Sequence, residues 1–208
     1  MRLPLLYGLL LSCLALPVSA TRLLIFGDSL SAGYQLPADR AWPALLQRQW
    51  QDQGRDWQVI NASVSGETTQ GGNARLASLL SRHQPDWVLI ELGANDGLRG
   101  LAVAQTQRNL ESMIKTAQQT GSQVILTQIR LPPNYGARYV QQFDQLYPAL
   151  ATQYHLPLLP FFMEKIITEP TLLLRDGLHP NAQAQPIIRD QVAEFVVPYL
   201  ETSAKLNK

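Results

Sequence analysis

Short apolar segments that alternate with amphipathic segments are the feature that most restricts the fold of this chain. Several are apolar at consecutive positions, which is typical of strands buried on both faces of a parallel sheet. Strands that alternate with helices favour a parallel sheet covered by helices on both sides. We therefore expect an α/β fold, a three-layer α/β/α doubly wound domain with a five-stranded parallel sheet. The expected strands are 23–26, 57–62, 86–92, 123–129 and 156–161.

Two details of this pattern predict local structure. Trp42, Leu46 and Trp50 are spaced as on one face of a helix, and Asp39 is a suitable N-cap residue before it. The last expected strand, 156–161, is interrupted by proline, which cannot donate to a neighbouring strand. We expect that strand to lie at an edge of the sheet.

The N-terminal twenty residues have the pattern of a secretory signal peptide. Arg2 precedes an apolar run over 3–16, and small residues lead to Ala20, so we expect cleavage after Ala20. The run is too short for a comfortable membrane span. We expect one mature domain over 21–208, periplasmic or secreted and without stable membrane insertion. The alternatives are a retained anchor or lipoprotein processing at Cys13.

Charge and cysteine content exclude several functions. The chain has 17 Lys and Arg against 16 Asp and Glu, and no basic stripe or charged block, which argues against nucleic acid as a partner. The one cysteine, Cys13, lies in the expected signal peptide, so the mature chain can form no internal disulfide. The three histidines are far apart, and we expect no metal site. The length fits a single domain.

Polar residues follow the carboxyl ends of several expected strands. Loops at that edge of an open α/β sheet are where ligands bind. Residues that are distant in the sequence are therefore expected to converge there. They are Ser29, Gly66, Asn95, Asp176 and His179.

Ser29 is a candidate nucleophile, which needs a neighbouring base to take its proton. His83 lies in the last turn of an amphipathic segment and His155 has no polar motif around it. His179 follows Asp176 by three residues, so one turn of chain can bring the carboxylate to the imidazole and orient it. An Asp-x-x-His pair can also be an ordinary capping turn.

An ester attacked by Ser29 develops negative charge on its carbonyl oxygen, which needs hydrogen-bond donors placed beforehand. The backbone N–H groups of Ser29 and Gly66 are candidates, because glycine allows close approach of the backbone. The side-chain amide of Asn95 is a third candidate. Asn95 can equally be a turn residue in its Asn-Asp-Gly run.

Four sequence blocks, taken in order, resemble those of the SGNH (GDSL) hydrolases. The resemblance spans almost the whole mature chain, and it implies the flavodoxin-like fold of that family without a metal or cofactor. The blocks are Gly27-Asp28-Ser29-Leu30, Gly66, Gly93-x-Asn95-Asp96 and Asp176-x-x-His179.

The resemblance also implies roles for these residues. Ser29 corresponds to the nucleophile, His179 to the base and then acid, and Asp176 to its orienting partner. Ser29, Gly66 and Asn95 correspond to the oxyanion hole. The chain departs from the family at none of these positions.

The sequence around the blocks is similar to bacterial periplasmic members of the family that hydrolyse acyl-CoA thioesters, lysophospholipids and simple esters. Lysophospholipids are the expected natural substrate, because coenzyme A esters should be scarce in the periplasm. We expect a monomer that acts on small acyl esters or thioesters. An apolar groove beside the nucleophile is expected, although ordinary core packing explains each candidate equally well. The candidates are Leu98, Leu131, Tyr135 and Leu178.

Two other functions remain open at this stage. A carbohydrate or peptidoglycan O-acetylesterase would use the same catalytic groups, and the apolar loops weigh mildly against it. A catalytically inactive binding module is the alternative outside enzymes.

Overall fold

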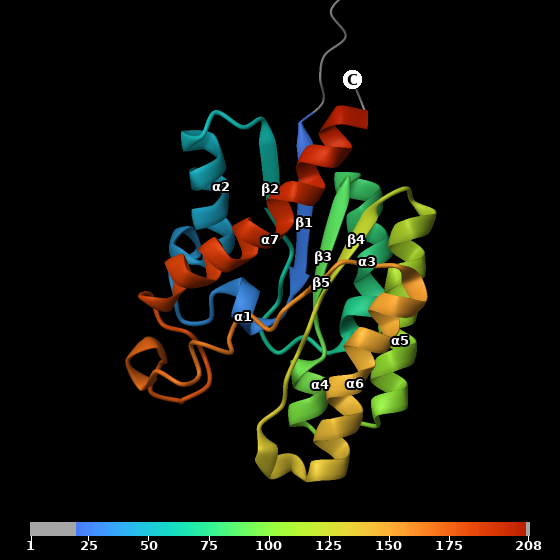
Figure 1. Cartoon of the computed structure of the whole chain (residues 1–208), viewed down its shortest axis with the longest axis vertical. Helices are drawn as coiled ribbons and strands as arrows, with labels where there is room; N and C mark the ends of the chain where they lie inside the picture. The colour runs from blue at the N-terminus through green and yellow to red at the C-terminus, as the bar shows by residue number, and fades with distance from the viewer. Residues whose placement is uncertain (1–19, 207–208) are drawn as a thin grey trace, which may run out of the picture.

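The computed structural model describes residues 20–206, and its centre is a five-stranded sheet in which every strand runs parallel to its neighbours (Figure 1). The strand order is β2-β1-β3-β4-β5, which is the flavodoxin-like order. The predicted fold class is therefore confirmed. The strands are β1 (Thr21–Gly27), β2 (Trp57–Asn61), β3 (Trp87–Glu91), β4 (Gln123–Thr127) and β5 (Leu158–Leu159).

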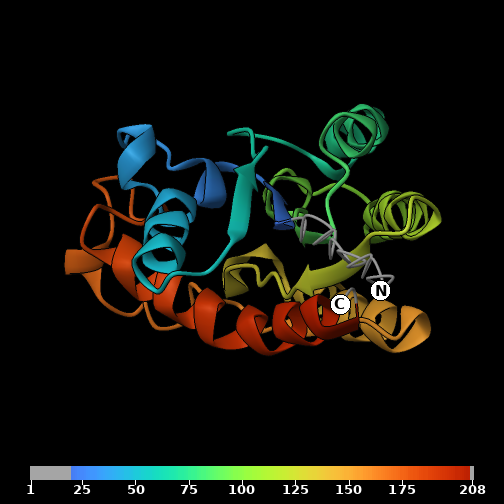
Figure 2. The same ribbon diagram turned by 90° about the horizontal axis from the view of Figure 1, so that it is seen from above.

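Two groups of helices cover the two faces of the sheet. Helices α2 (Trp42–Asp52) and α7 (Ala184–Leu206) pack on one face. The other face is covered by α3 (Thr69–His83), α5 (Val103–Gln119) and α6 (Ala137–Tyr154). In the view from above, α3 and α5 lie together on the side away from α2 (Figure 2).

The core follows from the alternation of side chains along each strand. In β1, Leu23 and Ile25 pack with Trp42 and the α7 side chains, whereas Leu24 and Phe26 pack against α3 and α5. All four β1 side chains have no exposed surface. Burial on both faces explains why the strand is apolar at consecutive positions.

Strand β5 is shorter than the predicted 156–161 and lies at the edge of the sheet, as expected. Pro157 and Pro160 flank its two residues. Proline has no backbone N–H and cannot donate to a neighbouring strand, although the Pro157 carbonyl still accepts the Leu126 N–H of β4 at 3.0 Å.

The N-cap expected at Asp39 is wrong. Asp39 lies in a separate 3-10 helix, η1 (Ala38–Arg40), and α2 begins at Trp42 without a capping side chain. The Trp42 backbone N–H instead donates to Gln185 Oε1 of α7 at 2.9 Å. This first N–H group of α2 thus bonds to a residue 143 positions away, which no local pattern reveals.

The predicted signal peptide lies almost wholly outside the described residues, which begin at Ala20. Within 20–206, none of the helices is both long and apolar enough to span a bilayer.

Candidate active site

Ser29 is the first residue of a one-turn helix, α1 (Ser29–Ala32), that directly follows β1. Asp28 caps this helix, because its Oδ1 accepts the Leu30 backbone N–H at 3.1 Å. Gly33 ends the helix with a φ of 75°, a left-handed conformation that glycine adopts without strain. The sharp turn leaves Ser29 half-buried at the carboxyl edge of the sheet.

His179 lies in the loop that leads into α7, and this loop is folded around Asp176. Asp176 Oδ1 accepts the backbone N–H groups of Leu178 at 2.9 Å and His179 at 3.0 Å. The other carboxylate oxygen lies 2.8 Å from His179 Nδ1. The Tyr34 ring packs against the imidazole, with the two ring centroids 4.3 Å apart.

The electrostatics of Asp176 set the tautomer of His179. The hydrogen bond from the His179 backbone N–H is the main cause that lowers the pKa of Asp176 to about 2. An ionised carboxylate can only accept, so His179 Nδ1 carries the proton and Nε2 is left as an acceptor. That Nε2 atom lies 2.9 Å from Ser29 Oγ. The structure therefore joins Ser29, His179 and Asp176 in one chain of hydrogen bonds.

Asn95 lies in a short helix, α4 (Ala94–Leu98), that follows β3, and so not in a simple turn. Its side-chain Nδ2 donates to Asp28 Oδ2 at 3.0 Å, which brings the segments after β1 and β3 together. Gly93, the N-cap residue directly before this helix, has a φ of 120°, and a Cβ there would lie 2.1 Å from the Tyr147 hydroxyl. Only glycine fits at this position.

Gly66 lies in the loop between β2 and α3, with a φ of 79°. Its carbonyl oxygen accepts from Arg99 at 3.0 Å. The same loop is held at its base by Arg75, which contacts Glu67 at 2.5 Å and the Ala62 carbonyl at 2.7 Å. Gly66 itself is exposed and is not among the residues that line the cavity beside Ser29.

Asp96 connects this loop to Asn95. Its buried carboxylate accepts the Thr69 backbone N–H at the start of α3 at 2.8 Å and also the Thr69 hydroxyl. The Thr106 hydroxyl of α5 donates to the same group at 3.3 Å. The Asp96 side chain thus ties three helices together directly beside Asn95.

A cavity of about 420 Å³ opens beside Ser29, Asn95 and His179. Three of the four apolar residues expected in a groove line it, namely Leu98, Leu131 and Leu178. Tyr135 does not line it. Tyr135 is the last residue of a 3-10 helix, η2 (Pro133–Tyr135), and Pro132 and Pro133 at the start of this helix line the cavity instead.

Sequence reasoning missed part of the lining of this cavity. Phe161, Met163 and Ile167 all line it, and they lie in the irregular segment that follows β5. The apolar run Phe161-Phe162-Met163 was visible in the sequence. The sequence of this run does not distinguish Phe161 and Met163, which line the cavity, from Phe162, which is buried in the core.

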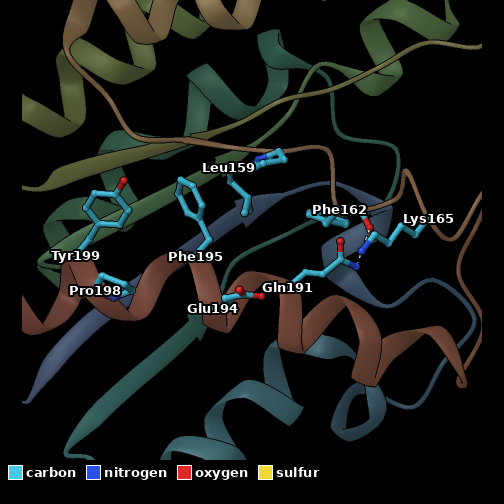
Figure 3. A pocket seen from close by; sticks show the side chains of 9 residues that line it. Leu159, Phe162, Lys165, Gln191, Glu194, Phe195, Pro198 and Tyr199 are labelled. Atoms are coloured by element: carbon cyan, nitrogen blue, oxygen red, sulfur yellow. Dashed lines mark hydrogen bonds between the residues drawn. The ribbon is translucent and has the colours of Figure 1, made fainter.

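A second hollow lies along α7 (Figure 3). Phe195 and Tyr199 project from α7 into it, with Lys165 at the other end. None of the site residues expected from the sequence lines it. Of the catalytic candidates, Ser29, Asn95 and His179 line the first cavity, and none lines the second.

Two buried carboxyl groups adjoin Ser29, one from Asp28 in the turn itself and one from Glu91 at the end of β3. Burial raises the pKa of Asp28 to about 7 and raises that of Glu91 well above its usual range.

Among the described residues, no group of three or more His, Cys, Asp or Glu side chains could hold a metal ion.

Comparisons with known proteins place these features in a family. Residues 25–186 match the model of the GDSL-like Lipase/Acylhydrolase family. "Thioesterase 1/protease 1/lysophospholipase L1" of Escherichia coli (strain K12) is 49% identical, covering 94% of this chain and 92% of the relative. "Arylesterase" of Vibrio mimicus is also 49% identical, covering 90% of this chain and 94% of its own length.

A solved structure shows the same fold. The crystal structure of the psychrotrophic esterase EstA from Pseudoalteromonas sp. superimposes with a TM-score of 0.85. The two sequences are 41% identical, and the match covers 87% of this chain and 99% of the other.

The raised pKa of Asp28 predicts a specific dependence of stability on pH. An Asp with the usual pKa of 3.8 ionises in the unfolded chain well before the folded protein does at about 7. The folded state therefore binds more protons between these values, and its stability falls as pH rises through them. An asparagine side chain cannot ionise, so we expect the Asp28→Asn variant to gain stability relative to the wild type between about pH 4.5 and about pH 8.

Urea denaturation of both proteins at the two pH values measures this difference. A stability difference that stays constant, or that moves in favour of the wild type as pH rises, would contradict the raised pKa.

Proposed function

This chain belongs to the GDSL-like lipase/acylhydrolase family and is an ester hydrolase, and from that premise we propose that Ser29, His179 and Asp176 form its catalytic triad. The observation that carries the proposal is the hydrogen-bond chain from Ser29 Oγ through His179 to Asp176, with distances of 2.9 Å and 2.8 Å. A serine hydroxyl attacks an acyl carbon only when a base removes its proton. His179 Nε2 is at the required distance.

The proposed reaction runs in two halves. Ser29 Oγ bonds to the carbonyl carbon of the ester while its proton passes to His179 Nε2. The ionised Asp176 stabilises the imidazolium that results. His179 then gives the proton to the leaving alcohol or thiol as the bond to the acyl carbon breaks. In the second half, water attacks the acyl-enzyme by the same proton transfers, and the carboxylic acid and Ser29 are released.

We propose that the oxyanion is stabilised by the backbone N–H groups of Ser29 and Gly66 and by the Asn95 amide. Asn95 lines the cavity together with Ser29 and His179, and its amide donates one hydrogen bond, to the Asp28 carboxyl group. The amide has two N–H bonds, so the second is available to a substrate oxygen. Arg99 donates a hydrogen bond to the Gly66 carbonyl, which restrains the loop that supplies the Gly66 N–H.

The cavity supports a substrate with an acyl chain. Its walls are mostly apolar, with side chains such as Leu98, Leu131 and Ile167 beside Ser29, and burial of each methylene group contributes about 0.8 kcal/mol. We propose medium and long acyl esters and thioesters as substrates, with lysophospholipids as the natural class. A relative whose name includes thioesterase and lysophospholipase supports this. All the proposed groups come from one chain, so the reaction needs no second copy.

The proposed roles predict different losses for two substitutions. Ser29→Ala removes the nucleophile and should abolish both ester hydrolysis and labelling by a fluorophosphonate probe. Asn95→Ala should keep the labelling site but lower turnover roughly 100- to 1,000-fold, the usual effect of losing one oxyanion donor. Circular dichroism confirms that each variant is folded. Hydrolysis retained by folded Ser29→Ala would reject the triad, and a destabilised Asn95→Ala protein with normal turnover would assign Asn95 a structural role.

The apolar cavity predicts a preference for chain length that depends on its lining. Leu98→Phe adds volume inside the cavity, so we expect the kcat/KM ratio for p-nitrophenyl decanoate over p-nitrophenyl acetate to fall about 10-fold. Leu101→Phe is the matched control, because Leu101 is exposed and lies outside this cavity. An unchanged ratio in Leu98→Phe, or an equal fall in the control, would show that the acyl chain binds elsewhere.

We further propose that the chain is exported, from the pattern of its first twenty residues. N-terminal sequencing of protein recovered from the producing cells should then begin at Thr21. A recovered chain that starts at Met1 would argue against removal of this segment.

A further inference from the structure

Glu91 is a completely buried carboxyl group for which the proposed reaction has no use. It is the last residue of β3 and is paired in register with Gly27, the last residue of β1. The preceding residues of β3, Val88, Leu89 and Ile90, are apolar and also fully buried. An acidic side chain at this depth is costly unless its contacts are needed.

Those contacts lie on both sides of the proposed nucleophile. Glu91 Oε2 accepts from the Ser31 hydroxyl at 2.7 Å and from the Asp28 backbone N–H at 3.4 Å. Asp28 directly precedes Ser29 and Ser31 follows it by two residues. One carboxyl oxygen therefore bridges the two ends of the turn that presents Ser29.

The local backbone is shaped to admit this carboxyl group. A Cβ at Gly27 would lie 2.4 Å from Glu91 Oε2, so any larger residue would displace the carboxyl or the turn. The second oxygen, Oε1, is buried and has no hydrogen-bond partner among the described residues. Core packing alone does not account for a group that leaves one polar atom unsatisfied.

We propose that Glu91 is a positioning residue for the nucleophile, which acts by holding the β1–α1 turn so that Ser29 Oγ stays within reach of His179 Nε2. The proposal rests on the proposed role of Ser29. The same turn carries Asp28, whose side chain accepts from Asn95 at 3.0 Å. Glu91 thus supports both the attacking group and the contact that orients a proposed oxyanion donor.

The charge state of the site suggests the conservative variant for a test. Burial raises the pKa of Glu91 well above its usual range, and the neighbouring Asp28 raises it further. Burial therefore favours the uncharged form of the Glu91 carboxyl group. Glutamine is also uncharged, has the same length and keeps a carbonyl oxygen as acceptor. Glu91→Gln should retain the two contacts that the proposal requires.

The experiment compares Glu91→Leu, Glu91→Gln and Thr127→Val with the wild type. Thr127 is the control, because it ends the adjacent strand β4, is fully buried and has a hydroxyl without a partner among the described residues. The readouts are kcat and KM for p-nitrophenyl esters, the rate of fluorophosphonate labelling at Ser29, and the melting temperature. Activities are expressed per folded protein.

We expect Glu91→Leu to lose about 10- to 100-fold in kcat, with KM nearly unchanged, because a small displacement of the reacting group lowers turnover by this order. The labelling rate should fall by the same factor. Glu91→Gln should recover most of both rates, and Thr127→Val should match the wild type. Should Glu91→Leu fail to fold, Ser31→Ala removes one of the two contacts and should lower the labelling rate several-fold.

The outcomes separate this proposal from the function on which it rests. A wild type that is not labelled at Ser29 overturns the proposed function. A wild type that is labelled, together with folded Glu91→Leu or Ser31→Ala labelled at the same rate, overturns only the role of Glu91. A lower melting temperature with unchanged labelling assigns Glu91 to stability and likewise overturns the proposal.

Discussion

The hydrogen bond between His179 Nε2 and Ser29 Oγ joins residues 150 positions apart, and the architecture of the protein makes that contact possible. Parallel strands end at one edge of the sheet, so the turn after β1 and the loop before α7 face the same space. Each partner is fixed by its own short-range contacts. Asp28 caps the turn at Ser29, and Asp176 folds the His179 loop through three hydrogen bonds. Accurate placement thus arises from two small, locally determined structures brought together by a rigid sheet.

The carboxyl groups around this contact have contrasting roles because their surroundings differ. Asp176 is partly exposed, with 38% of its side-chain surface accessible, and accepts two backbone N–H groups, which favours its charged form. Asp28 lies in the turn and Glu91 packs against it, and burial shifts both carboxyl groups toward the neutral form. Under the proposed mechanism, this contrast favours negative charge at Asp176, where an imidazolium would form. It also favours less negative charge on the two buried acids, which still accept hydrogen bonds close to the proposed oxyanion.

Much of the fold could be predicted from the sequence because its determinants are local. Consecutive apolar residues such as Leu23 to Phe26 reveal burial on both faces of a strand, and Pro157 and Pro160 reveal an edge. The grouping of Ser29 with His179 also followed from the position of Ser29 at a strand end and of His179 in the loop before the last helix, since both can reach the carboxyl edge of the sheet. The hydrogen bonds of Glu91 and Gln185 could not be predicted in this way, because each joins two segments that only the packing of the whole domain brings together. The cavity wall at Phe161 and Met163 was missed for the same reason, since irregular chain has no periodicity to indicate which side faces a ligand.

The bond from Trp42 to Gln185 has a consequence for the biogenesis of the protein. It joins the first residue of α2 to an acceptor in α7, the last helix. His179 lies in the loop directly before α7. A ribosome delivers the N-terminal end first, so a nascent chain presents the serine long before its base exists. Under the proposed mechanism, hydrolytic activity appears only when the C-terminal helix docks on the sheet, and incomplete chains remain inert toward the lipids of the cell that makes them.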